Sequence, residues 1–257
     1  MCLIRKLEAL GACIINDRRS EEGASDPKIV AQLLLARTIA HAGSIRLLVS
    51  KRKIVEARIL VRCCVENLLW IANLVENGDQ AVSKMVGSDL KHRRMFGERL
   101  LQSIPQEQKK EMVNLRQMMR DIKEHWPDIE TVNPKDIADM GAARDAYVFY
   151  SELSMDSAHP TTDALSRHLS DSEVCLKPVL KSEEVQTTLW YTAMTLLGAC
   201  VGINQIMERT EGVRKLHELE AEYQEIYRWY TDVLGECLKP VRSDHGLAIT
   251  VAEALTD

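Results

Sequence analysis

The chain has 257 residues, of which 46% are hydrophobic and 28% charged, and its formal net charge at pH 7 is -5. This length and composition are those of a folded globular protein with a sizeable core. The negative charge argues against general adhesion to phosphate backbones and leaves room only for a local basic patch. Twelve glycines and seven prolines are few for this length, which favours long helices over a turn-rich β fold.

The first helix is expected over residues 1–17, where apolar residues recur at helical spacing. A polar linker follows, so residues 1–26 are interpreted as an N-terminal helix and linker. Asp26 and Pro27 then supply a helix cap and a proline in the first turn. They predict a second helix from about residue 27 to residue 49.

The central helix is predicted over residues 54–77, the longest run of apolar periodicity that still contains charge. Its apolar residues cover most of the circumference, as expected of a helix inside a bundle. Gly78 ends this helix, and a strongly charged segment follows over residues 79–125, broken at Pro105. Helices this polar are expected to form an outlying hairpin rather than part of the core.

Further helices are expected near 143–169, 183–209 and 212–238, and the tail 239–257 is expected to be flexible. No run of alternating apolar and polar residues indicates strands. We therefore predict an all-α fold. In it, residues 27–238 form a single helical-bundle domain that carries the outlying charged hairpin.

An uncharged stretch over residues 186–207 is long enough to span a bilayer. Its several threonines, together with Asn204 and Gln205, favour a buried core helix instead, and no membrane partner is predicted. Gly198 and Gly202 have the spacing that lets two helices approach closely.

Polar residues on the central helix form a stripe. Arg58, Arg62, Glu66 and Asn73 fall within one narrow sector at 100° per residue. An arginine is seldom buried unpaired, so this stripe must meet carboxylates, hydroxyls or a ligand. Two interpretations stay open, a buried ion-pair network that fixes the helix register and an anion or phosphodiester site.

A second polar cluster lies downstream and contains Tyr150, Ser154, Asp156 and His159. Its histidine has the chemistry of an acid, a base or a ligand near neutral pH. Alternatively, the cluster caps a helix and the histidine packs with satisfied nitrogens. We expect the stripe and the cluster to meet inside the bundle.

The candidate residues follow from this expectation. The catalytic candidates are Arg62, Glu66 and His159. The ligand-binding candidates are Arg58, Tyr150, Ser154 and Asp156.

The sequence contains no P-loop, dinucleotide-binding or zinc-protease fingerprint and no paired Glu-x-x-His motifs. No cofactor and no metal site is therefore predicted. Seven cysteines without metal-type spacing are typical of reduced thiols in a cytoplasmic protein.

The Arg62-x-x-x-Glu66 helix, followed by the Tyr150 to His159 cluster, resembles a large family of uncharacterised, mostly bacterial helical proteins. That family is distantly similar to the HEPN superfamily of helical bundles, and the resemblance covers roughly residues 27–209. It implies an RNase or a defence or toxin component. HEPN nucleases use an arginine, a polar residue and then a histidine four to six positions on, a string that Arg120 to His125 fits.

Three functions of different classes are thus expected. The first is an RNA-cleaving or phosphodiester-processing enzyme, in which an arginine stabilises developing charge and a histidine transfers protons. The second is a non-catalytic module that forms homo-oligomers or binds a protein partner. The third is a sensor that binds a nucleotide or another anion.

Overall fold

The computed structural model describes residues 1–15, 23–170, 173–180, 183–208 and 212–234. The predicted tail 239–257 lies outside the described residues. The fold is all-α, as predicted. The helices, in chain order, are α1 (Cys2–Ile15), η1 (Gly23–Ser25), α2 (Pro27–Ser50), α3 (Ile54–Ser103), α4 (Gln106–Lys109), α5 (Val113–His125), α6 (Pro134–Asp139), η2 (Arg144–Ala146), α7 (Tyr147–Leu153), η3 (Ser154–Ala158), α8 (Thr162–Ser166), α9 (Glu184–Ile206) and α10 (Val213–Leu234).

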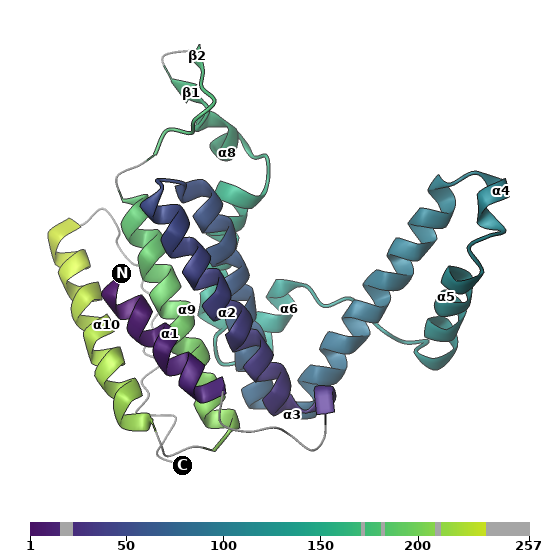
Figure 1. The fold of residues 1–257 in the computed structure, drawn as a ribbon, viewed down its shortest axis with the longest axis horizontal. Helices are drawn as coiled ribbons and strands as arrows, with labels where there is room; N and C mark the ends of the chain where they lie inside the picture. The colour runs from purple at the N-terminus through teal and green to yellow at the C-terminus, as the bar shows by residue number, and fades with distance from the viewer. Residues whose placement is uncertain (16–22, 171–172, 181–182, 209–211, 235–257) are drawn as a thin grey trace.

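The body of the molecule is a helical bundle built around α2, the first half of α3, and α9 (Figure 1). The helix α1 packs on α2, α9 and α10, and its Leu7 is fully buried. The N-terminal helix is thus part of the bundle. The Asp26 carboxylate accepts a hydrogen bond from the Lys28 backbone nitrogen at 2.8 Å and so caps α2 as the sequence predicts.

The uncharged stretch forms α9, a buried core helix as predicted, and it packs against the first half of α3. A Cβ atom on Gly198 would lie 2.8 Å from Leu68 Cδ1, and one on Gly202 would lie 2.6 Å from Ile71 Cγ2. Real Cβ atoms do not come this close to other heavy atoms, so both glycines serve the packing of two helices of the same chain.

Among the described helices, α2 is the one whose length and apolar composition would let it cross a membrane. Length and composition do not distinguish such a span from the core helix of a soluble protein or from a signal sequence.

The helix α3 changes direction at Gly78, where the backbone has φ 46° and ψ -120°. A positive φ of this kind is open to glycine and strained for other residues. The second half of α3 leaves the bundle, and α4 and α5 return along it as a projecting arm (Figure 1). We define the arm as residues 79–133. The outlying hairpin predicted over 79–125 is therefore present.

The segment predicted as one helix near 143–169 is instead divided into η2, α7, η3 and α8, followed by a small hairpin. Its strands are β1 (Leu169–Ser170) and β2 (Glu173–Val174), which pair antiparallel. The element η3 is a π-helix that directly continues α7. A π turn holds one more residue than an α turn, so it changes which side chains of this segment face α3.

Candidate functional site

A buried arginine near the start of α3 joins three other elements. The Arg58 side chain is 4% exposed, and its Nε donates to Asp156 Oδ2 on η3 at 2.5 Å. Its Nη2 donates to Glu152 Oε1 on α7 at 2.8 Å, and its Nη1 to Thr187 Oγ1 on α9 at 3.4 Å. One guanidinium group thus ties α3 to α7, η3 and α9.

The same aspartate holds a second arginine. Arg167, which follows α8, donates through Nη2 to Asp156 Oδ1 and also lies 2.6 Å from Glu184 Oε1. The Arg167 and Glu184 side chains are about as buried as that of Arg58. We call Arg58, Glu152, Asp156, Arg167 and Glu184 the buried ion network. Its three carboxylates and two guanidinium groups are close to charge balance.

The network fixes the protonation of Asp156. Burial alone raises the pKa of this carboxyl, but the hydrogen bond from Arg167 and the positive charge of Arg58 outweigh it. The pKa of Asp156 therefore lies below its ordinary value. Burial likewise lowers the pKa of Arg58, and its two carboxylate partners more than reverse that effect. Asp156 and Arg58 are therefore both held in their charged forms, as a structural ion-pair network requires.

Arg62, one turn further along α3, has different surroundings. Its side chain is 21% exposed, and its one carboxylate neighbour in the described structure, Glu66, lies 3.7 Å away and is itself 38% exposed. Instead of carboxylates it contacts hydroxyls. Its Nε donates to Ser154 Oγ at 2.8 Å, and its Nη2 donates to the Tyr150 hydroxyl oxygen. The guanidinium carbon also lies 4.3 Å from the centre of the Tyr150 ring, within the range of a cation–π contact.

Tyr150 and Ser154 are presented together because α7 and η3 place them four residues apart on one face. The Ser154 hydroxyl donates its proton to the Tyr150 carbonyl oxygen at 2.8 Å, so it acts only as an acceptor toward Arg62. Burial raises the pKa of the Tyr150 phenol, more than the nearby Arg62 charge lowers it. The phenol is therefore protonated at neutral pH and keeps a proton to donate. We call Arg62, Glu66, Tyr150 and Ser154 the Arg62 site.

The structure does not bring His159 into this site. The His159 side chain is exposed, and the hydrogen bonds of this residue are made by its backbone, from its nitrogen to the Ser154 carbonyl and from the Thr161 nitrogen to its own carbonyl. The reason is local. The π-helix ends at Ala158, and His159 is in an extended conformation that directs the chain away from α3.

The Arg120 and His125 pair lies on α5 in the arm, far along the chain from the Arg62 site. Both side chains are exposed. Arg120 donates to the Gln117 side chain, and His125 Nδ1 lies 2.8 Å from the Asp121 carbonyl oxygen. These contacts are within one helix and join the pair to no residue of the bundle.

Sequence reasoning found Arg58 and Asp156 but missed three members of the buried ion network, Glu152, Arg167 and Glu184. Glu184 is the acidic residue in the first turn of α9, just before the uncharged stretch that drew attention to this helix. Arg167 follows a five-residue helix whose pattern is too short to reveal a buried side. The signal that points to Arg167 is indirect: a buried Asp156 with two carboxylate oxygens leaves room for a second cation beside Arg58. The signal for Glu184 is the same argument one step on, because a buried Arg167 in turn requires carboxylate partners.

Within the described residues, no group of three or more histidine, cysteine, aspartate or glutamate side chains is arranged to hold a metal ion. The six cysteines of this part of the chain are free thiols. Cys64 and Cys200 are buried, and burial raises the pKa of the Cys200 thiol to about 12. These two cysteines serve as core packing residues.

The chain matches the model of a family of unknown function (DUF5677) over residues 28–174. This span contains Arg62, Glu66, Tyr150 and Ser154 and therefore the whole Arg62 site. No curated protein and no solved structure matches the chain.

Proposed function

The chain belongs to this family of unknown function, and we propose from its own geometry that it binds a phosphate-bearing ligand at the Arg62 site. The ligand class is a phosphomonoester or phosphodiester, as in a nucleotide or RNA. Of the two functions expected for such a site, binding is supported better than cleavage. The alternative is an RNA-cleaving enzyme with a defence or toxin role, which rests on the resemblance of the sequence motifs to HEPN proteins.

One observation carries the proposal, which is the contrast between Arg62 and the two buried arginines. Arg58 and Arg167 each have carboxylate oxygens within 2.8 Å, whereas Arg62 has only the exposed Glu66 at 3.7 Å. A guanidinium group without a close carboxylate has positive charge left for a ligand. Its planar fork suits the oxygens of a phosphate group.

The neighbouring groups strengthen this match. The Tyr150 phenol is protonated and adds a hydroxyl donor beside the guanidinium group. Ser154 and the Tyr150 ring fix the direction of Arg62, so the fork is oriented before a ligand arrives. Because Glu66 is exposed, its carboxylate has room to move aside when an anion replaces it.

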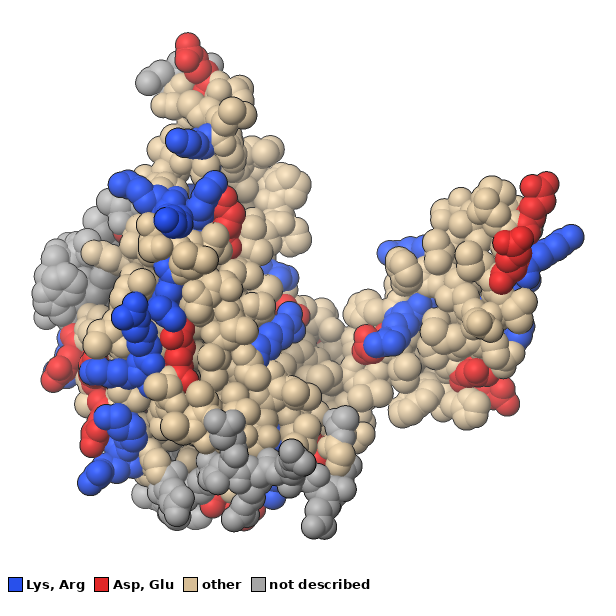
Figure 2. Space-filling view, viewed as in Figure 1, with Lys and Arg blue, Asp and Glu red and all other residues tan. Residues whose placement is uncertain are grey.

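Cleavage has less support because proton transfer needs an acid or a base within hydrogen-bond reach of the scissile bond. His159 lies outside the site, and His125 lies on the arm. A broad nucleic-acid surface also has little support. On the face seen in Figure 2, basic and acidic side chains are interspersed over both the body and the arm. These features favour recognition of a single phosphate group over electrostatic attachment to a long strand.

The test is a set of calorimetric titrations of the full chain with inorganic phosphate, with a mononucleotide and with a short single-stranded RNA. We expect Arg62→Gln to weaken binding about tenfold or more, since a charge-assisted hydrogen bond is removed. Glu66→Gln should instead strengthen binding, because the carboxylate competes with the ligand. Arg93→Gln, which alters an exposed ion pair on the arm, is the matched control.

Equal affinity in the wild type, Arg62→Gln and Arg93→Gln would exclude the site. Product formation from RNA is followed in the same samples. If the wild type cleaves RNA and His159→Ala or His125→Ala abolishes this cleavage, the RNase alternative would be favoured over the binding function.

A second proposal concerns a protein partner, and it rests on the arm. Phe96 is 67% exposed and Val113 is 60% exposed there, although most large apolar side chains of the described bundle are covered. Exposed apolar side chains on a projecting element are typical of interaction surfaces. If the arm mediates homo-oligomers, light scattering of the purified chain should give more than the monomer mass of 29.1 kDa, and Phe96→Glu should lower it.

A further inference from the structure

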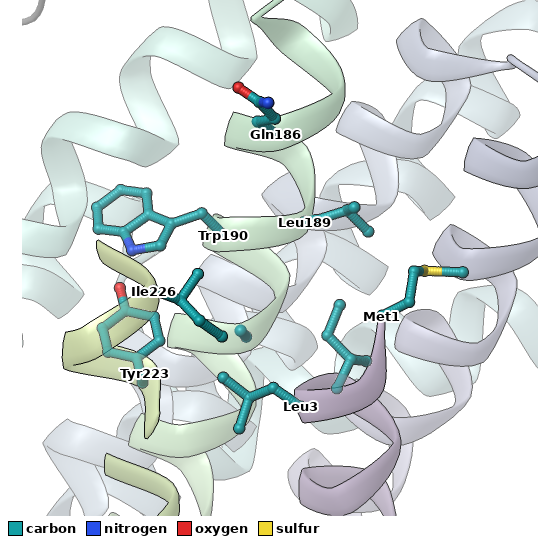
Figure 3. A pocket seen from close by; sticks show the side chains of 9 residues that line it. Met1, Leu3, Gln186, Leu189, Trp190, Tyr223 and Ile226 are labelled. Atoms are coloured by element: carbon teal, nitrogen blue, oxygen red, sulfur yellow. The ribbon is translucent and has the colours of Figure 1, made fainter. Parts of the chain in front are cut away.

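A cavity of about 160 Å³ lies between α1, α9 and α10, away from the Arg62 site (Figure 3). In Figure 3, Trp190 and Tyr223 lie on one side of it and Met1 and Leu3 on the other. Its lining residues are Met1, Leu3, Ile4, Gln186, Leu189, Trp190, Ala193, Tyr223 and Ile226.

The chemistry of the lining restricts the ligand. No lining side chain is charged, and most are aliphatic or aromatic. Leu3 and Ile4 are 4% and 1% exposed, so these walls belong to the packed core. A charged ligand would lose its hydration here without an ionic partner in return. The occupant must therefore be an uncharged molecule with a mainly apolar surface.

One polar atom of the lining is unsatisfied. The Trp190 indole nitrogen Nε1 is buried and makes no hydrogen bond of good geometry. The Tyr223 hydroxyl lies close enough to interact with it, but is poorly aligned as an acceptor. Buried indole N–H groups usually have an acceptor, and a native exception calls for an explanation. Figure 3 shows this nitrogen at the end of the cavity next to Tyr223. A ligand with one hydrogen-bond acceptor at that end would supply a better-aligned partner than the Tyr223 hydroxyl.

The aromatic wall is fixed before any ligand binds. The Trp190 ring stacks on Tyr227 at a centroid distance of 5.2 Å and on Tyr223 at 6.0 Å, and Phe149 meets it edge-on at 5.7 Å. Side chains of α10 and α7 thus hold the indole of α9 in place. A wall that does not reorganise loses little entropy on binding.

From these observations we propose that the cavity binds a small uncharged apolar molecule of six to ten heavy atoms with a single carbonyl or ether-type acceptor, which accepts from Trp190 Nε1. The size follows from comparison with an engineered apolar cavity of roughly 150 Å³ that binds benzene. This site is independent of the proposed function of the Arg62 site, with which it shares no residue.

The test uses two probes of nearly equal shape, cyclohexanone, which has an acceptor oxygen, and methylenecyclohexane, which has none. Each is titrated into the full chain while the Trp190 indole N–H signal is followed by NMR. This signal is assigned from its loss in Trp190→Phe. We expect both probes to give saturable shifts, with the larger downfield shift for cyclohexanone. Because Trp190→Phe lacks this signal, binding of both probes to this variant and to the wild type is measured by calorimetry. The variant should bind cyclohexanone about fivefold more weakly relative to methylenecyclohexane, as one neutral hydrogen bond predicts.

A blocking variant locates the site. Ala193→Leu extends a side chain into the cavity and should abolish the shifts of both probes. If this variant does not fold, Ile226→Trp replaces it, because Ile226 is 43% exposed and tolerates a larger side chain. Binding that survives the blocking variant, or no saturable shift up to the solubility limit of either probe, would overturn the proposal. Equal weakening of the two probes by Trp190→Phe would overturn the role of the indole N–H as donor.

Discussion

The two halves of α3 share one secondary structure and have opposite surroundings. Before Gly78, most of the helix lies inside the bundle, and even Arg58 is buried. After Gly78, the buried positions are few and small, such as Gly87 and Gly97, and large side chains such as Phe96 face solvent. The same backbone geometry therefore supports a core helix in one place and a projecting arm in the other.

Arginine side chains are also paired differently in the two halves of α3. In the bundle, Arg58 has a partner on each of three other elements, because a buried guanidinium group without partners would be heavily destabilising. On the arm, Arg93 pairs with Asp89 one turn away at 2.7 Å, with both side chains more than half exposed. The first pairing fixes how elements meet, whereas the second stays within one helix. Disrupting each should have different consequences.

The largest effect is expected for Arg58→Ala. This change removes the cation that Asp156 and Glu152 share; Asp156 keeps Arg167, and Glu152 is 46% exposed. It should lower the free energy of unfolding by about 3–4 kcal/mol, the lower part of the range for a broken buried ion pair. The matched change on the arm, Arg93→Ala, should lower it by at most about 0.5 kcal/mol, because exposed ion pairs contribute little. Urea unfolding of both variants measures the difference. Similar losses for the two would contradict the contrast between the halves.

A smaller, pH-dependent effect is expected for Asp156→Asn. The pKa of Asp156 is lowered in the folded state, so its carboxylate contributes stability at pH values above the unfolded-state pKa of about 3.9. That contribution is lost as the pH falls through the folded-state pKa.

The variant should therefore be less stable than the wild type by about 2–3 kcal/mol at pH 7, and the two unfolding curves should converge below about pH 4. Denaturation at a series of pH values tests this. A constant difference down to pH 2 would mean that the carboxylate charge is not what the network uses.

Two glycines provide a third comparison, of about 1–3 kcal/mol: Gly141, which packs against the first half of α3, and Gly97, which lies in the second half. A Cβ on Gly141 would lie 2.7 Å from the Asn73 backbone nitrogen, which has no freedom to move. A Cβ on Gly97 of the arm would instead meet the flexible end of Met119 at 2.9 Å. We expect Gly141→Ala to lower the melting temperature by several degrees and Gly97→Ala to change it little. A larger loss for Gly97→Ala would show that the arm is packed as tightly as the bundle.

The sequence anticipated the break at Gly78, the buried environment of α9 and the partners of Arg58 and Arg62 within Tyr150 to Asp156. These rest on periodicity and on local chemistry, which a sequence displays directly. It did not anticipate Arg167 and Glu184, because their contacts with Asp156 depend on the path of α8 and on the packing of α9. His159 was predicted to belong to the cluster because it is close along the chain. In the structure the π-helix ends at Ala158, and the extended His159 has an exposed side chain. The fold agrees with the all-α prediction.

The smallest effect is expected at the junction itself, for Gly78→Ala. An alanine at φ 46° and ψ -120° is strained by roughly 1–2 kcal/mol. The chain has two ways to respond, which are to keep the bend and bear the strain, or to straighten α3 and move the arm. Contacts on both sides oppose straightening.

On one side, Asn77 Nδ2 donates to the Met140 carbonyl oxygen at 2.8 Å and to Asn73 Oδ1 at 2.7 Å. On the other, the Val132 backbone nitrogen donates to Ser88 Oγ at 3.2 Å, so the chain that returns from the arm is attached to both halves. The bond between Asn77 and Asn73 lies within the first half and would survive straightening. The other two bonds hold the ends of the short stretch 132–140, so straightening would break one of them at about 1 kcal/mol and would pull α6 away from its contacts with α3. The bend should therefore persist, with a loss of about 1 kcal/mol in unfolding free energy and an unchanged distance between spin labels on α2 and α5. A longer label distance together with unchanged stability would show that Gly78, rather than the contacts around it, sets the direction of the arm.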